Sequence, residues 1–195
     1  MMLAIGGAQR TKRLVTAAVL IVVMLACVRF AVALSQPTTV TNLTPSMPLG
    51  LYVTRPAPAP SVGMVATVDV SGAALRRARE LDSALPVDGG HSQLLKVVVG
   101  VPGERYRVNA RGIYVSGVLL TASAPLAGVR RASSGIVPPG AVLAWSPVRA
   151  SLDSRYLGPL PLIAQATPKT AFSARDSQRL RPKFSVDESI GEAGR

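Results

Sequence analysis

One segment of the chain is too apolar for a loop or the surface of a small globular domain. Leu14–Leu34 is a run of 21 residues with one charged residue, Arg29. Because about twenty apolar residues span a bilayer as an α-helix, this run predicts a transmembrane helix. Basic residues stand at positions 10, 12 and 13, and such residues mark the cytoplasmic side of a membrane helix. We therefore expect residues 1–13 to be cytoplasmic and the chain after Leu34 to be exported.

A cleaved signal peptide is the alternative interpretation of the same run. Ala31–Ala33 has the small-residue pattern of a cleavage site. The run is longer than the apolar core of a typical signal peptide, which favours a retained signal-anchor over residues 14–34. Both interpretations export the rest of the chain.

The exported part has the composition of a small β domain. Between the apolar run and a polar C-terminal stretch lie about 130 of the 195 residues, enough for one hydrophobic core. Aromatic residues make up 4% of the chain, beside 16 Pro and 17 Gly, which favours short strands and turns over a helical bundle. We expect residues 35–164 to form one mainly β domain and residues 165–195 to form a polar, mobile tail.

Hydrophobic patterning places the elements of this domain. Residues 35–43 are expected to form a short stalk or first strand. One amphipathic helix is expected at Ala73–Leu85, ended by Pro86, within an insertion Ser71–Gln93. Further strands are expected at Gly63–Val70, Leu94–Val101, Arg105–Asn109, Gly112–Val115, Val118–Thr121 and Ala141–Trp145.

Charge and composition narrow the partners and the chemistry. The net charge is +12, but the basic residues are spread over the chain without interleaved aromatics, so we expect no nucleic-acid partner. A basic surface favours anionic lipid headgroups, which suits a lipid bilayer as partner. One cysteine and one histidine argue against a disulfide framework, a cysteine-rich zinc site and a Ser-His-Asp triad. We expect neither a metal nor a cofactor.

A lysine stands inside the most apolar of the predicted strands. Burial of Lys96 disfavours the charged amine and lowers its pKa, and a neutral amine can act as a general base. Ser46 lies between Pro45 and Pro48, on backbone that Pro48 keeps out of the helical region. A Ser/Lys pair needs no histidine, so these two residues form a candidate dyad. The alternative is a lysine that snorkels at a sheet edge and a serine in a plain turn.

Three motifs in chain order resemble those of type I signal peptidases. Thr44–Pro48 (TPSMP) resembles their nucleophile box, Leu95–Glu104 (LKVVVGVPGE) their lysine box, and Ser151–Gly158 (SLDSRYLG) their third box. The form Ser46–Tyr52 (SMPLGLY) is most similar to the TraF-type conjugative transfer signal peptidases. Pro147–Ala150 stands where the family usually has Gly-Asp-Asn-Arg, which favours this shorter conjugative subfamily.

The resemblance implies a role for each matching residue. Ser46 would be the nucleophile and Lys96 the general base. Thr44 would donate to the oxyanion together with the backbone N–H of Ser46, and Ser151 would orient the lysine amine. Two further matching residues would form a structural ion pair under the site: Asp153 and Arg155.

The resemblance also implies a fold and an activity. The fold would be mainly β, a signal-peptidase-like antiparallel β-barrel core with one N-terminal transmembrane helix and a short helical insertion. The activity would be that of a membrane-anchored serine endopeptidase, at the periplasmic side of the cytoplasmic membrane. It would mature exported pilin-like precursors for conjugative transfer, with cyclisation of the product as a further expectation. The alternative is a non-catalytic exported component of a transfer apparatus with a degenerate peptidase fold.

Overall fold

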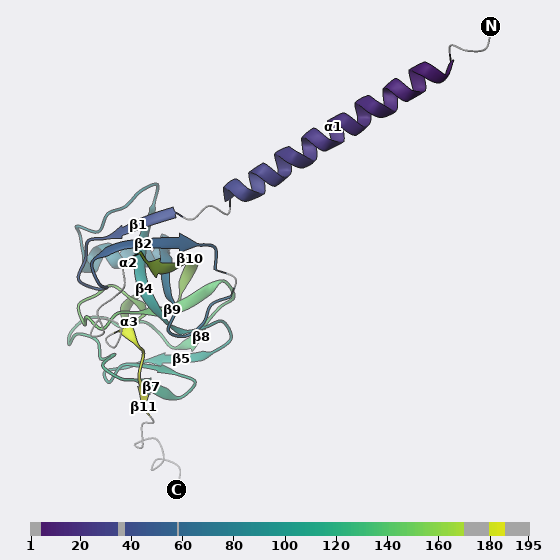
Figure 1. The fold of residues 1–195 in the computed structure, drawn as a ribbon. Helices are drawn as coiled ribbons and strands as arrows, with labels where there is room; N and C mark the ends of the chain where they lie inside the picture. The colour runs from purple at the N-terminus through teal and green to yellow at the C-terminus, as the bar shows by residue number, and fades with distance from the viewer. Residues whose placement is uncertain (1–4, 35–37, 58, 170–179, 186–195) are drawn as a thin grey trace. The chain divides into compact units, whose positions relative to one another are not determined.

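The computed structural model describes residues 5–34, 38–57, 59–169 and 180–185 (Figure 1). It divides into two units, Met1–Pro37 and Thr38–Arg195. The boundary between the units falls three residues after the predicted end of the apolar run at Leu34.

The first unit contains one long helix, α1 (Ile5–Leu34), of 30 residues. It begins before the apolar run, and large apolar side chains between Val15 and Val28 are exposed. In the described ranges, no helix is long and apolar enough to cross a membrane. The transmembrane helix predicted at residues 14–34 is therefore not confirmed.

The second unit is built from two antiparallel sheets. The larger sheet has six strands. Each strand pairs with the next in the order given below, and the last strand, β9, also pairs with the start of β10. In spatial order its strands are β1 (Thr38–Asn42), β2 (Gly50–Arg55), β10 (Leu160–Pro168), β3 (Val65–Ser71), β4 (His91–Gly100) and β9 (Ala141–Trp145).

The smaller sheet has five short strands (Figure 1). In spatial order these are β11 (Phe184–Ser185), β7 (Val118–Leu120), β6 (Ile113–Val115), β5 (Arg105–Val108) and β8 (Gly135–Ile136). The two sheets confirm a mainly β, antiparallel fold. They also confirm strands close to each predicted range.

The continuous apolar run in β4 is buried on both faces of its sheet, as its composition predicts. Val97 and Val99 join a core cluster shared with the smaller sheet, whereas Val98 joins a second cluster beneath α2. Because side chains alternate along a strand, Lys96 lies on the face of Val98. That face carries the site described below.

Two short helices complete the second unit. α2 (Gly72–Leu81) ends four residues earlier than the predicted helix. The reason is Asp82, whose backbone is extended and whose side chain accepts a hydrogen bond from the N–H of Ala84 at 3.0 Å. Such a local side-chain turn competes with helix continuation. α3 (Ser154–Leu157) begins after Asp153, which caps it by accepting from the N–H of Arg155.

The expected polar tail is in part a component of the fold. Residues 165–168 continue β10, where they pair with β2. Leu180 is buried in the core, and β11 pairs with β7. The predicted boundary at residue 165 is therefore wrong, because it cuts a strand. Residues 170–179 and 186–195 of the predicted tail lie outside the described residues.

Candidate active site

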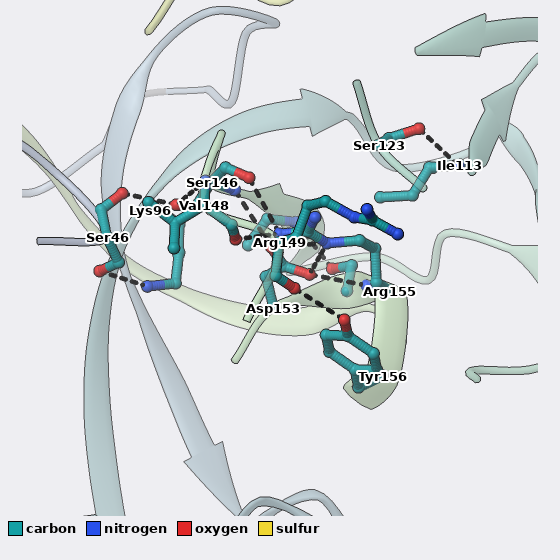
Figure 2. A network of polar contacts seen from close by, with 12 residues as sticks. Ser46, Lys96, Ile113, Ser123, Ser146, Val148, Arg149, Asp153, Arg155 and Tyr156 are labelled. Atoms are coloured by element: carbon teal, nitrogen blue, oxygen red, sulfur yellow. Dashed lines mark hydrogen bonds and ion pairs between the residues drawn. The ribbon is translucent and has the colours of Figure 1, made fainter. Parts of the chain in front are cut away.

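Ser46 lies on the turn that joins β1 to β2. The pairing of Asn42 with Gly50 closes this turn at its base. Met47, the next residue, is buried in the core and anchors the turn. The carbonyl of Ser46 accepts a hydrogen bond from the hydroxyl of Ser146, which follows β9 (Figure 2). The nucleophile candidate is thus held through its backbone while its own hydroxyl stays half-buried.

Lys96 and Ser46 meet although they are 50 residues apart in the chain. The Nζ atom of Lys96 donates to the Oγ atom of Ser46 at 3.1 Å (Figure 2). Lys96 is 3% exposed, and its strand, β4, lies between β3 and β9 in the sheet. The lysine therefore does not snorkel at a sheet edge.

Burial sets the electrostatics of Lys96. It lowers the pKa of the amine from 10.5 to about 8, because the charged form loses its hydration. This value already includes two smaller effects, because the carboxylate of Asp153 raises the pKa and the guanidinium of Arg155 lowers it. About one amine in ten is then neutral at pH 7, and that fraction can accept a proton.

Thr44 faces the same hydroxyl from the turn itself. Its Oγ1 lies 3.0 Å from the Oγ of Ser46 and donates to the Oδ1 of Asn42, also at 3.0 Å. The side chain of Thr44 is exposed, so a bound substrate can reach it. Its predicted donation to an oxyanion stays a prediction.

Asn42 was not expected from the sequence. It is buried at the end of β1, and its Nδ2 donates to the carbonyls of Thr44, Met47 and Pro48 at 2.8–3.0 Å. This one amide spans the turn on both sides of Ser46 and also accepts from the hydroxyl of Thr44. An asparagine before a proline-containing turn is an ordinary turn residue, so the sequence offers no separate signal for this role.

Ser151 lines the same cleft as Lys96. Its hydroxyl is buried and has no hydrogen-bond partner among the described residues. The predicted orientation of the lysine amine by Ser151 is not a contact in this structure, and it stays a prediction.

Asp153 and Arg155 form a fully buried ion pair behind Lys96. The Nε of Arg155 donates to Oδ1 of Asp153 at 2.9 Å, and its Nη2 donates to the carbonyls of Ser146 and Val148 at 2.9 and 2.7 Å (Figure 2). Asp153 in turn accepts from the N–H of Ser146 at 3.1 Å. The pair therefore fixes Ser146, which holds the carbonyl of Ser46. Ser146 is the second residue of this network that the sequence did not indicate.

A cleft of about 430 Å³ opens over Ser46 and Lys96. Its walls are mainly aliphatic and come from α2 with the segment after it, from β4, and from the loops near residues 126–129 and 148–152. Met47 and Leu49, two apolar residues close to Ser46 in the turn, do not line it: Met47 is in the core and Leu49 projects into solvent at 66% exposure. The insertion Ser71–Gln93, for which the sequence predicts no definite role, supplies three wall residues: Leu81, Asp82 and Leu85.

His91, the one histidine, lies away from this cleft. Its Nδ1 is 3.0 Å from Oδ1 of Asp69, which lies on β3 two residues before Ser71, the residue paired with His91. In the part of the chain that the structure describes, no three His, Cys, Asp or Glu side chains gather where they could hold a metal ion.

The comparison with known families agrees with this arrangement. The family described as signal peptidase, peptidase S26, matches residues 11–167. The chain belongs to this family, and the matched range contains every residue of the candidate site.

Three relatives carry a more specific name. A probable conjugal transfer protein TraF of Sinorhizobium fredii (strain NBRC 101917 / NGR234) is 34% identical over 130 residues, which cover 62% of this chain and 69% of the relative. The conjugal transfer protein TraF of Agrobacterium tumefaciens (strain 15955) is 30% identical over 145 residues, covering 67% and 81%. That of Agrobacterium fabrum (strain C58 / ATCC 33970) is 33% identical over 151 residues, covering 67% and 81%. The resemblance to TraF-type signal peptidases is confirmed.

Proposed function

We propose that this protein is a serine endopeptidase in which Ser46 attacks the substrate and Lys96 is the general base. The observation that carries the proposal is the 3.1 Å hydrogen bond between Nζ of Lys96 and Oγ of Ser46, made by a buried amine with a lowered pKa. A buried, partly neutral amine beside a serine hydroxyl is the arrangement that Ser/Lys catalysis requires. It also speaks against the alternative of a non-catalytic component with a degenerate peptidase fold.

The reaction proceeds in two stages. The neutral amine of Lys96 takes the hydroxyl proton of Ser46 while the Oγ of Ser46 forms a bond to the substrate carbonyl carbon. The oxygen of that carbonyl becomes an oxyanion, which is stabilised by the backbone N–H of Ser46 and by the hydroxyl of Thr44 after its proton turns from Asn42 to the oxyanion. Lys96 then gives the proton to the departing amine as the peptide bond breaks, which leaves an ester on Ser46. Lys96 then takes a proton from a water molecule whose oxygen attacks the ester carbon, and it returns this proton to the Oγ of Ser46 as the ester bond breaks.

The substrate we propose is an exported, pilin-like precursor processed for conjugative transfer. The relatives named conjugal transfer proteins support this setting. An aliphatic cleft beside the dyad suits an extended apolar segment of such a precursor. We place the enzyme at the cytoplasmic membrane with residues 14–34 as its anchor, the peptidase domain on the periplasmic side, and a β-barrel core of the signal peptidase kind.

We include in the proposal a second outcome of the same ester, cyclisation of the product. An amine of the substrate held beside the ester has a high effective concentration and can attack it in place of water. The product is then about 18 Da lighter than the linear form, the mass of one water, and has no free N-terminus.

Mass spectrometry of a co-expressed pilin precursor tests the proposal. Wild-type protein is expected to convert the precursor to a shorter mature form, and the Ser46→Ala variant is expected to leave it intact. Circular dichroism of the variant serves as the folding control. Normal maturation by Ser46→Ala would falsify the proposed dyad.

A further inference from the structure

A second hollow lies beside the cleft and is lined by arginines. It has a volume of about 420 Å³, between α2 and the segment Arg130–Ser133. Glu80 is the one carboxylate among the described residues that line it. Four arginines line it, which leaves three positive charges without an opposite charge: Arg76, Arg77, Arg130 and Arg131.

The backbone around this arginine hollow is held in place. Arg77 pairs with Glu80 at 2.7 Å and donates its Nη2 to the carbonyl of Arg130 at 3.0 Å, which joins α2 to the loop. On the other side, the N–H of Ala132 donates to the carbonyl of Arg155 at 2.9 Å. The other three arginine side chains are exposed and form no ion pair with a described residue. They are available to a ligand without rearrangement of the loop.

The arginine hollow adjoins the catalytic cleft. Tyr156 lines both, and Val129 lines the cleft immediately before Arg130 lines the hollow. On α2, Leu81 of the cleft follows Arg77 of the hollow by one turn, which is about 6 Å along the axis. About two residues of an extended peptide cover that distance. A substrate that contacts Leu81 therefore brings a nearby side chain to the arginines.

Guanidinium groups bind carboxylates through paired hydrogen bonds, and several convergent arginines favour an acidic side chain. We propose that the arginine hollow is a secondary binding site for an acidic segment of the substrate. The acidic residue would lie about two to four residues from the segment held in the cleft. This inference rests on the proposed endopeptidase function. A lipid phosphate is also an anion, but the position of the hollow beside the cleft favours the substrate chain.

The test uses the full-length protein in detergent and synthetic peptides that span the cleavage site of the co-expressed precursor. The peptides come in pairs, one pair for each position on either side of the cleavage site, and the two peptides of a pair have Glu or Gln at that position. At one position KM is expected to be about fivefold lower with Glu, an advantage that fades as salt is raised. The kcat value should not change, because Ser46 and Lys96 are untouched.

Two variants separate the arginine hollow from a general charge effect. The double variant Arg130→Gln/Arg131→Gln is expected to abolish the preference for Glu. The matched control Arg105→Gln/Arg181→Gln removes the same charge outside the hollow and is expected to keep the preference. In a charge swap, Arg130→Glu/Arg131→Glu leaves two arginines against three glutamates in the hollow, so this variant should favour a peptide with Lys at the same position over the Glu peptide.

Equal KM values for Glu and Gln peptides at every position would overturn the secondary site and leave the endopeptidase intact. The proposal is also wrong if the double variant loses binding to phosphatidylglycerol vesicles while its peptide KM values do not change. If no peptide is cleaved, the proposed function fails instead. In that case the secondary site is tested by the affinities of fluorescent Glu and Gln peptides for the Ser46→Ala protein. Equal affinities would reject the secondary site.

Discussion

Lys96 is the residue whose chemistry carries the proposed function, and its burial also destabilises the fold. Its pKa is about 8 in the folded protein, against 10.5 for an exposed lysine. Between these pH values the unfolded chain binds more protons than the folded chain, so stability rises with pH. Below pH 8 both states are protonated and the whole penalty for burying the charge is present.

Replacing this amine should therefore stabilise the protein while removing its activity. Lys96→Met keeps a side chain of similar length and is expected to raise the free energy of unfolding by about 3 kcal/mol at pH 7. The gain should shrink as the pH rises from 8 to 10.5 and vanish above that, because the wild-type lysine is then neutral in both states. Urea unfolding at the two pH values measures it. A stabilisation that does not depend on pH would contradict the assigned pKa.

The pH dependence of the reaction follows from the same titration. Because the neutral amine is the active form, kcat/KM is expected to rise with pH and level off above about pH 8. Peptide cleavage between pH 6 and 10 gives the profile. A rate that still climbs at pH 10 would mean that the base keeps an ordinary lysine pKa.

Asn42 is expected to position the nucleophile without touching the substrate. Asn42→Ala removes the three donations that span the turn, so kcat should fall about ten- to a hundredfold while KM changes little. The midpoint of the pH–rate profile of Asn42→Ala should equal that of wild type, because Lys96 stays buried. Asn42→Asp keeps the acceptor for Thr44 but lacks the donors, and it should be equally slow. A shifted midpoint or a raised KM would point to a broader disruption of the site.

At the scale of elements, the Asp153–Arg155 pair links β9 and α3 to the turn that carries Ser46. Removing one partner of a buried ion pair leaves the other uncompensated, so Asp153→Asn should lower stability by about 3–5 kcal/mol. The same change removes the carboxylate that raises the pKa of Lys96. The midpoint of the pH–rate profile should therefore move to lower pH. An unchanged or higher midpoint would show that the carboxylate does not act on the amine.

The elements also differ in how well the sequence predicts them. The sequence predicts β4 well because its apolar residues are continuous and buried on both faces of the sheet. β10 is missed because it has a proline at position 161 and at its end, and because Ala164 and Ala166 provide much of its buried face. Small buried residues leave little hydrophobic periodicity to detect. The early end of α2 depends on a side-chain turn at Asp82, and Pro86 is the stronger signal in the sequence.

At the scale of the whole molecule, the pairing of Ser46 with Lys96 was predictable from the sequence, and the residues that hold them in place were not. A lysine in an apolar strand and a serine between prolines are unusual in themselves. Asn42 and Ser146 are ordinary residue types, and their roles come from contacts made on folding. Ser146 reaches the carbonyl of Ser46 across 100 residues of chain. The cleft walls depend in the same way on segments that are distant in sequence.

Detection of the acyl-enzyme is the most direct test of the central claim, that Ser46 is the nucleophile and Lys96 its base. The protein is mixed with precursor, quenched in acid within the first turnover, digested with trypsin and analysed by mass spectrometry. We predict a substrate fragment esterified to Ser46 in wild type and no adduct in Ser46→Ala or Lys96→Met. Precursor cleavage that leaves the adduct on another residue, or an adduct that persists in Ser46→Ala, would contradict the account.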